Sequence, residues 1–318
     1  MMVRTRHADK VLDAVRSPSQ AAMSSLVASW RRSLIRHRLD PEALPKNQIV
    51  TASELKALRE SNEMLLSVTE PVLERIFQSV GKAGCCVALT DVNGVILEQR
   101  TTLQDKTDFF GIGIADGGCW GEANVGTNGI GTCLYEDQPV TIYRDQHFST
   151  RNTNISCMDA PVHDPHGRLV AALDVSNCRD DFTPIMASMT SALVQDAARH
   201  IESAYFRRYF SHARVIYLDE DLQAGAAMLA IDQDDIILGA NRGARALLNV
   251  NDDILAEGRS LAQLLQHKAP PSFADGERAV LRQALVNAGG NASKAARQLG
   301  ISRATFYRRM AKAGFTMA

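Results

Sequence analysis

The sequence has no run of about eighteen apolar residues, the length that a helix needs to span a membrane. Its first residues are charged and lack the apolar segment of a secretory signal. Its cysteines lack the spacing of a zinc finger. In a chain of 318 residues, six such cysteines indicate reduced thiols in a cytoplasm rather than a disulfide framework: Cys85, Cys86, Cys119, Cys133, Cys157 and Cys178. We therefore expect a cytoplasmic protein without membrane contact.

A phosphate-binding loop is also missing. Such a loop needs the pattern G-x-x-x-x-G-K-[ST]. The Gly-Lys pair Gly81-Lys82 is followed by Ala83 and has no glycine at the required upstream position. The glycines between Gly126 and Gly131 are not followed by Lys-Ser and follow no clean strand–helix unit. We therefore expect no ATP hydrolysis.

The charge of the chain is unevenly distributed. Its net charge is −1, but the segment from Gly276 to Ala318 holds eight Lys and Arg residues against the single acid Glu277. That segment carries +7, so the remainder carries about −8. A basic module on an acidic body indicates a protein that neutralises nucleic-acid phosphates. A solvated basic helical hairpin is the plainer alternative.

The last forty residues have the pattern of a helix-turn-helix. The range Glu277–Ala288 reads as one helix, and the following Gly-Gly pair ends it. Asn291 is a good N-cap for a second helix that ends near Leu299. Gly300 provides a tight turn, and Ser302 caps a third helix that runs to about residue 313. The third helix is expected to enter the DNA major groove from its N-terminal end.

The third helix divides into a core face and a DNA face. The expected core consists of Ala295, Ala296, Leu299, Ile301, Phe306 and Met310. The expected base contacts are Ser302, Arg303 and Thr305. The remaining predicted DNA-binding residues, which include the phosphate contacts, are Asn291, Lys294, Tyr307, Arg308, Arg309 and Lys312.

The rest of the chain reads as a multidomain α+β protein. Residues 1–80 look helical, with one helix leading toward Pro41 and another over about Ser53–Val80. These helices either pack on the next domain or pair across a dimer. Residues 182–212 form a linker helix with apolar residues near heptad spacing, which suits dimerisation.

Residues 81–181 predict an antiparallel sheet with helices. Strands 86–91 and 95–98 meet at Asn93-Gly94, and strands 158–163 and 168–176 meet at the turn 164–167. Residues 139–143 add a strand. The Gly-rich stretch 111–132 is long enough to be a binding loop.

Residues 213–268 predict a smaller αβ unit. Strands 227–231 and 236–240 form a hairpin, and Asn241 caps a helix to Leu248. This order of elements resembles a truncated PAS-type domain. Residues 272–318 form the helix-turn-helix domain.

Two sets of motifs resemble known families. The tail resembles the Fis-type helix-turn-helix of bacterial activators through its Gly290-Asn291, Ala295-Ala296, Leu299–Arg303, Thr305 and Tyr307-Arg308. The remainder resembles acetoin-catabolism-type bacterial regulators, which have a GAF sensor domain. The matching stretches are Ser29–Ser33, Leu39–Pro41, Trp120–Glu122, Gly126–Thr132, His147-Phe148, Cys157, Ala160-Pro161, Gly167–Leu169 and Leu173–Ser176.

The resemblance implies a ligand-responsive transcriptional regulator, not an enzyme, with no cofactor. Many members carry an ATPase module of some 200 residues between sensor and tail, whereas about sixty residues separate the two here. The implied partners are operator DNA with an inverted repeat, a second copy of the chain and RNA polymerase. The implied effector is an alcohol, diol, ketone or aromatic metabolite.

The expected effector pocket is mostly apolar, with a few polar groups. Its candidate residues are Phe109, Trp120, Asn128, Thr132, His147, Cys157 and Asp159. The two aromatic residues also suit a packed core. His147 is the best polar candidate, although a structural histidine with satisfied hydrogen bonds is an equal alternative.

Two other chemistries stay open at this point. A metal could be held by His147, Cys157, His163 and His166, although their spacing is poor. Some GAF domains are free methionine sulfoxide reductases, so a thiol enzyme or redox switch could use Cys85, Cys119, Cys133 and Cys157.

Overall fold

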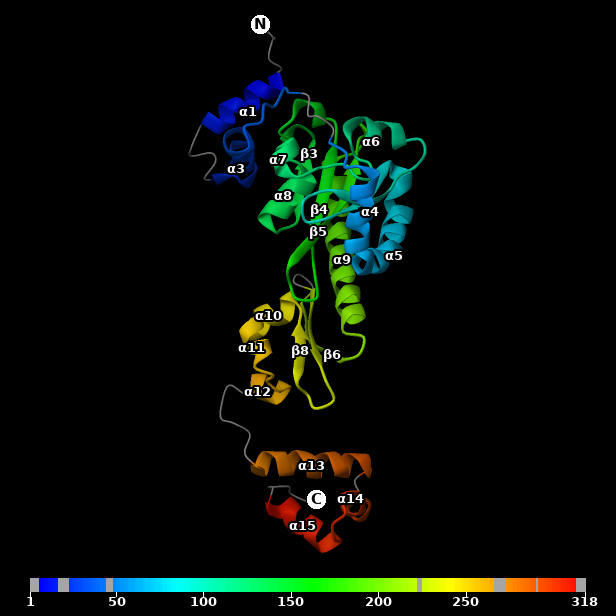
Figure 1. The fold of residues 1–318 in the computed structure, drawn as a ribbon, viewed down its shortest axis with the longest axis vertical. Coiled ribbons are helices and arrows are strands. Elements are labelled where there is room, and N and C mark those ends of the chain that lie inside the picture. The colour runs from blue at the N-terminus through cyan, green and yellow to red at the C-terminus, as the bar shows by residue number, and fades with distance from the viewer. Residues whose placement is uncertain are drawn as a thin grey trace. The chain divides into compact units, whose positions relative to one another are not determined.

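Figure 1 shows the helices and strands of the computed structural model. The chain divides into two compact units. Unit 1 comprises Met1–Ala230 and Gly239–Val250, and unit 2 comprises Ile231–Leu238 and Asn251–Ala318. The structure describes residues 6–16, 23–43, 48–221, 225–265, 273–289 and 291–312. No helix within these ranges has the length and hydropathy that a bilayer crossing requires.

Unit 1 is built on a five-stranded sheet in the order β2-β1-β5-β4-β3. Each adjacent pair is antiparallel, which confirms the expected antiparallel sheet and both predicted hairpins. The strands are β1 (Cys85–Thr90), β2 (Ile96–Arg100), β3 (Val140–Tyr143), β4 (Ser156–His163) and β5 (Leu169–Asn177).

The two hairpin turns use the same local chemistry. One carboxylate oxygen of Asp91 accepts hydrogen bonds from the backbone N–H groups of Asn93 and Val95. Asp164 does the same for His166 and Arg168 in the second turn. Such Asx turns are encoded by residue type alone.

Helices cover both faces of this sheet. Residues that alternate along a strand point to opposite faces, so Val87 and Leu89 face one layer while Cys86 and Ala88 face the other. The first layer consists of α5 (Glu63–Val80) and α9 (Pro184–Tyr209). The second consists of α6 (Lys106–Ile112), α7 (Glu122–Val125) and α8 (Gly129–Glu136). Short 3₁₀ turns lie at Gly81–Ala83, Arg144–Gln146 and Thr150–Asn152.

The single helix predicted over about residues 53–80 is two helices. They are α4 (Ala52–Ser61) and α5, with Asn62 at the break. Asn62 has a φ of −111° and a ψ of 19°, outside helical values, and its side-chain amide donates to the carbonyl of Leu58. A polar side chain that competes for backbone groups therefore ends α4.

The Gly-rich stretch is not an open loop. Most of its second half lies in α7 and α8, and Gly129, Ile130 and Gly131 are buried. A Cβ on Gly131 would lie 2.3 Å from the backbone nitrogen of Glu122. These glycines therefore permit close backbone packing, and the expectation of a binding loop was wrong for this part.

The N-terminal helices form a cap on the same domain. They are α1 (Arg6–Arg16), α3 (Ser25–Arg31) and the π-helical η1 (Arg32–Arg36), which ends ahead of Pro41. Val11, Val15 and Trp30 pack with Phe148 of the domain. Of the two alternatives for this region, the structure shows packing on the following domain.

A second sheet in the order β6-β7-β8 follows α9. Its strands are β6 (Arg214–Asp221), β7 (Gly225–Ile231) and β8 (Ile237–Ala240). The helix α10 (Arg242–Leu248) begins where Asn241 accepts a hydrogen bond from the N–H of Ala244, as the sequence predicts. The remaining helices are α11 (Asp252–Ala256), α12 (Leu261–Leu265), α13 (Phe273–Asn287), α14 (Ala292–Gln298) and α15 (Arg303–Lys312).

Candidate nucleic-acid interface and buried polar core

The helices α13, α14 and α15 enclose one small core. Phe306 and Met310 of α15 are buried against Leu281 and Ala284 of α13, together with Ala295 and Ala296 of α14. Leu299 and Ile301 are partly buried beside them. The predicted core face of the third helix is confirmed.

Polar caps set the start of each of the last two helices. The side chain of Asn291 accepts from the backbone N–H of Lys294 at 3.1 Å. The hydroxyl of Ser302 accepts from the N–H of Thr305, and the two hydroxyl oxygens lie 2.9 Å apart. Gly300 has a φ of +65°, a conformation that glycine adopts without strain. The turn therefore fixes where α15 begins and which side chains lie at its N-terminal end.

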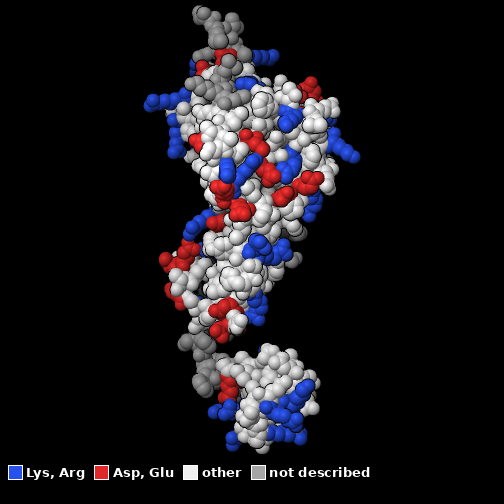
Figure 2. Space-filling view, turned by 45° about the vertical axis from the view of Figure 1, so that its right-hand side comes forward, with Lys and Arg blue, Asp and Glu red and all other residues white. Residues whose placement is uncertain are grey.

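The exposed face of this module is basic, as the cluster of Lys and Arg at the lower end of Figure 2 shows. Arg303 lies against the ring of Tyr307, with its guanidinium carbon 5.5 Å from the ring centroid. Arg309 pairs instead with Glu277 of α13 at 3.4 Å. The exposed cations of α14 and α15 are Lys294, Arg297, Arg303, Arg308, Arg309 and Lys312.

A line of buried polar side chains crosses the α8-facing side of the first sheet. Asp159 of β4 is directly opposite Asp174 of β5, and Cys157 is opposite Ser176. The Ser176 hydroxyl lies 2.9 Å from both carboxyl oxygens of Asp174 and 3.2 Å from the sulfur of Cys157. His147 lies next, with its Nε2 3.4 Å from that sulfur. This arrangement places five polar groups in an otherwise apolar core.

The histidine in this line is neutral. Its Nδ1 lies 2.9 Å from the carbonyl of Arg144, so Nδ1–H donates there and Nε2 is left to accept from the thiol of Cys157. Burial lowers the pKa of His147 to about 4. The same burial raises the pKa of the Cys157 thiol well above its usual range. The pair is therefore an uncharged hydrogen bond rather than a thiolate–imidazolium pair.

The two aspartates are the least satisfied groups of the core. When both carboxyls are charged, neither oxygen of Asp159 has a hydrogen-bond donor among the described residues, whereas a proton on Asp159 gives it a hydrogen bond to Asp174. Burial, with the charge of Asp174, raises the pKa of Asp159 well above its usual range. Burial also raises the pKa of Asp174 to about 7, against the hydrogen bond from Ser176. Because two buried carboxylates cannot both be charged cheaply, the pair keeps at least one proton at neutral pH.

Comparison with known families identifies both parts of the chain. Residues 65–204 match the GAF domain, and residues 272–312 match the Fis family of bacterial regulatory proteins. The chain joins a GAF domain to a Fis-type helix-turn-helix. Only residues 205–271 lie between the two matches, so no ATPase module of some 200 residues separates them.

The similar proteins include transcriptional regulators. The acetoin catabolism regulatory protein of Cupriavidus necator is 28% identical over 224 residues, covering 69% of this chain and 34% of that protein. The acetoin dehydrogenase operon transcriptional activator AcoR of Bacillus subtilis is 27% identical over 193 residues, covering 61% and 31%. The chain thus spans about a third of the length of these relatives.

One solved structure shares the fold over most of the chain. It is the crystal structure of the Escherichia coli DhaR(N)–DhaL complex, which covers 83% of this chain and 86% of that chain. The TM-score is 0.52 at 18% sequence identity. This likeness supports the fold of the GAF-containing part.

The GAF core separates the predicted pocket residues into two groups. Phe109 and Trp120 are packed in the apolar cluster, and the Trp120 indole donates to the carbonyl of Gly113. Asn128 caps α8 and also donates to the carbonyl of Trp120, while Thr132 lies in a network with the N-terminal cap. Three of the predicted residues do converge on the polar line: His147, Cys157 and Asp159.

Sequence reasoning missed two members of this line, Asp174 and Ser176. Both lie at alternate positions of β5, inside the predicted strand 168–176. Asp174 is a charged residue on a strand that is otherwise mostly apolar, and this pattern could have indicated a buried polar site.

A buried ionic seam joins the N-terminal cap to the GAF domain and was also missed. Arg32 pairs with Glu122 at 2.6 Å and with Glu136 at 2.9 Å, and its guanidinium carbon lies 3.6 Å from the ring centroid of Tyr135. The Glu122 side chain is only 3% exposed. Ser29 donates to the same carboxylate. The Ser-Trp-Arg-Arg-Ser motif therefore fastens the cap to the domain.

The geometry weighs against the two alternative chemistries. Burial raises the pKa of all six thiols, that of Cys178 to about 12, so none is a ready thiolate. His163 lies between Glu202 and Asp137, and His166 packs against the ring of Tyr209. Across the described ranges, no group of three or more His, Cys, Asp or Glu side chains is arranged so that it could hold a metal ion.

Proposed function

We propose that this chain is a ligand-responsive bacterial transcriptional regulator that binds operator DNA without hydrolysing ATP. The observation that carries the proposal is the basic α15 of the Fis-type module on the same chain as a GAF domain. The segment between the two matches contains no phosphate-binding loop. Effector binding would then change the affinity for DNA through a conformational change, without ATP hydrolysis. A bacterial regulator of this kind works in the cytoplasm, where the DNA is, by recruiting or blocking RNA polymerase.

The DNA contacts follow from the packing of α15. Because Phe306 and Met310 face the core, the opposite side of the helix faces the major groove. Ser302, Arg303 and Thr305 at its N-terminal end would then meet base edges. The phosphate contacts would come from side chains farther along and from the preceding helix: Asn291, Lys294, Tyr307, Arg308, Arg309 and Lys312.

We propose that the effector site lies in the GAF core, at the line of buried polar side chains. His147, Cys157, Asp159 and Asp174 offer acceptors and a carboxylic proton inside an apolar shell. A small alcohol or diol would donate its hydroxyl hydrogen to an unpartnered carboxyl oxygen of Asp159, while its carbon atoms take apolar contacts. Ketones and aromatic metabolites also suit the apolar shell, but those without a hydroxyl group cannot donate a hydrogen bond to Asp159.

The dimer is assigned to an apolar groove between α5 and α9. The groove has a volume of about 390 Å³ and is lined by Val80, Phe182, Met186, Met189 and Leu193, among others. Met189 is 70% exposed and Ile185, one turn earlier, is 74% exposed. Large apolar side chains on the outer face of a long helix favour a second copy of that helix as the partner.

The decisive experiment is selection of bound sequences from random DNA by the purified full chain. We expect enrichment of one inverted repeat, and a change in affinity for it when alcohols and diols are added. An Arg303→Ala variant should remain folded and lose the preference at one base pair of the enriched sequence. Recovery of no sequence preference from the unaltered chain would refute the proposal.

A further inference from the structure

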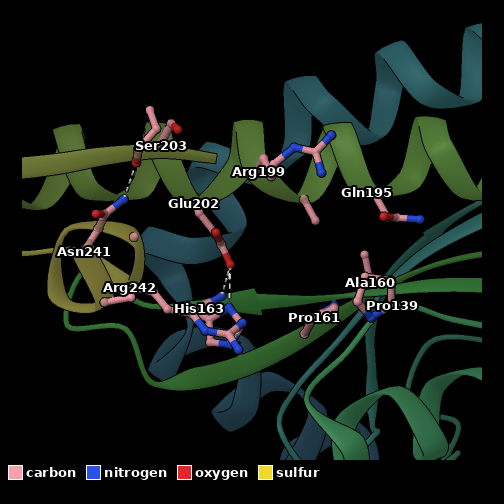
Figure 3. Close-up of a pocket in the computed structure, with 14 residues that line it drawn as sticks. Pro139, Ala160, Pro161, His163, Gln195, Arg199, Glu202, Ser203, Asn241 and Arg242 are labelled. Carbon is pink, nitrogen blue, oxygen red and sulfur yellow. Dashed lines mark hydrogen bonds and ion pairs between the residues drawn. The ribbon is translucent and has the colours of Figure 1, made fainter. Parts of the chain in front are cut away.

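A cleft outside the GAF core lies between the end of β4, the middle of α9 and the start of α10 (Figure 3). Its volume is about 350 Å³, within the range of small-molecule sites. Pro161 and Ala160 line the β4 side, Gln195 and Arg199 line the α9 side, and Arg242 lies on the α10 side. All of these elements belong to unit 1.

The cleft exists because β4 is longer than its neighbour. Strand β3 pairs with β4 only as far as Asp159, whereas β5 pairs with β4 to His163. The residues beyond Asp159 therefore have one unpaired edge, and Ala160, Pro161 and His163 line the cleft. Proline has no N–H, so this edge resists pairing with another strand and is available to a ligand.

Charged groups concentrate at one end of the cleft. The buried ring of His163 lies 2.6 Å from Glu202 through Nδ1 and 2.7 Å from Asp137 through Nε2, and the first contact is drawn in Figure 3. Arg242 pairs with the other oxygen of Asp137 at 3.3 Å. Burial lowers the pKa of His163, but the hydrogen bond and charge of Glu202 outweigh burial and raise it overall.

The two carboxylates at this end are therefore already engaged by His163. Arg199 and Arg242 contribute two further positive charges to the lining. Among the described residues, Arg199 pairs with Asp196, at 3.4 Å and on a carboxylate that is 76% exposed, which is a weak interaction. Arg199 can consequently reorient toward an incoming anion at little cost. Arg242 also contacts Nε2 of His163 at 3.0 Å, so an anion replaces that contact and the one to Asp137.

We propose that this cleft binds a small organic carboxylate, with Arg199 and Arg242 at its charge and the alanine and proline walls around its carbon atoms. Arginine suits the role because its planar group binds a carboxylate through two parallel hydrogen bonds. The site is separate from the effector site placed in the GAF core. An occupant competes with Asp137 for Arg242, so it changes how α10 is held on the GAF domain.

The test measures binding to the full chain by titration calorimetry, with benzoate and succinate as probes and benzamide and succinamide as neutral controls. We expect the carboxylates to bind and the amides not to bind. Arg199→Gln should weaken carboxylate binding by about tenfold or more, the loss of one charge-assisted pair. Arg208→Gln, on the same helix outside the cleft lining, should bind as the unaltered chain does.

A second pair of variants blocks the space instead of the charge. Ala246 lines the cleft and is exposed, so Ala246→Trp should close it without disturbing a core. Leu247→Trp, at a neighbouring position that is 54% exposed, is the matched control. Loss of binding in the first variant and retention in the second is the expected result.

Three results would overturn the proposal: equal binding of acids and amides, equal losses from Arg199→Gln and Arg208→Gln, or no binding of either acid. None of them touches the DNA selection experiment, since calorimetry is done without DNA. Repeating the titration in an Asp159→Asn background separates this cleft from the GAF core, because that change should leave carboxylate binding unaltered.

Discussion

Two aspartates face each other inside the GAF core. Asp174 accepts from Ser176, whereas Asp159 receives no hydrogen bond from the described residues when both carboxyls are charged. A proton on Asp159 gives it a hydrogen bond to Asp174. A buried unsatisfied polar group costs stability, so such a group is retained where it serves a ligand. At the scale of single residues, we therefore propose that Asp159 is the group that accepts a hydrogen bond from the effector.

The aspartate pair should make stability depend on pH. In the unfolded chain a carboxyl ionises above about pH 4, whereas the pKa of Asp159 is raised and that of Asp174 is about 7 in the fold. The stability that this pair contributes is therefore full below about pH 4 and is lost as the pH rises toward 7. Asp159→Asn should flatten that fall and raise neutral-pH stability by roughly 1–3 kcal/mol. Urea denaturation at several pH values between 4 and 7 measures the free energy of unfolding of both proteins.

The control is Asp180→Asn, because that side chain is fully exposed. Its denaturation curve should follow the unaltered chain at every pH. Parallel curves for the Asp159 variant and the unaltered chain would mean that the buried carboxyl does not titrate as described.

The N-terminal cap is an element that one buried ion pair holds in place. Arg32→Ala leaves Glu122 buried without its cation, which should lower the free energy of unfolding by about 3–5 kcal/mol. Arg16→Ala breaks a pair whose partners are both 73% exposed and should cost about 0–1 kcal/mol. Adding Glu122→Gln to Arg32→Ala should restore part of the loss. Urea denaturation of the unaltered chain, the two single variants and the double variant measures these differences. Equal losses from Arg32→Ala and Arg16→Ala would contradict a stabilising role for the buried ion pair.

The recognition helix should divide its contacts between bases and phosphates. Arg303→Ala should cost about 1–3 kcal/mol on the operator and relax the preference at one base pair. Arg308→Ala should weaken all sequences alike and lower the salt slope by about one per subunit. Arg308 is a cleaner phosphate probe than Arg309, which Glu277 holds. Binding isotherms at several salt concentrations, on matched and mismatched operators, measure the sequence preference and the salt slope. Equal losses on all sequences from both variants would contradict the prediction that the N-terminal end of α15 contacts the bases.

The core face of the same helix should affect folding rather than specificity. Phe306 is fully buried, so Phe306→Ala should destabilise the α13–α15 module by about 3–5 kcal/mol. Val286→Ala, at a position that is 69% exposed, should have little effect. Hydrogen exchange within α13–α15 of the full chain is the readout. Unchanged protection in the Phe306 variant would show that the three helices do not share this core.

At the scale of the whole molecule, one Fis-type module reads only a half-site, so we expect a dimer on an inverted repeat. The half-sites should lie about one helical turn apart, roughly 34 Å. Met189→Glu should dissociate the dimer and weaken binding to the inverted repeat, while binding to a lone half-site stays the same. Leu103→Glu, at a position that is 90% exposed and outside the groove, is the control. Sedimentation and footprinting measure these, and a monomer that protects a single half-site would contradict the dimer.

The sequence by itself determined the elements whose signals are local. The Asx turns at Asp91 and Asp164, the Asn caps and the glycine turn at Gly300 each act within a few residues. Each turn or cap can therefore be predicted from the residues next to it in the sequence. The helix-turn-helix was predicted almost completely for this reason, because a module of forty residues has mostly local contacts.

Only the tertiary structure decided which distant side chains meet. Asp159 faces Asp174 because of the register between β4 and β5, and a shift of one residue would place the two side chains on opposite faces of the sheet. Arg32 and Glu122 lie ninety positions apart in the chain and meet because the cap folds back onto α7. The Gly-rich stretch looked like an open loop, since glycine permits both open loops and close packing. Burial, charge pairing and register are sums over the whole fold, and no local pattern encodes them.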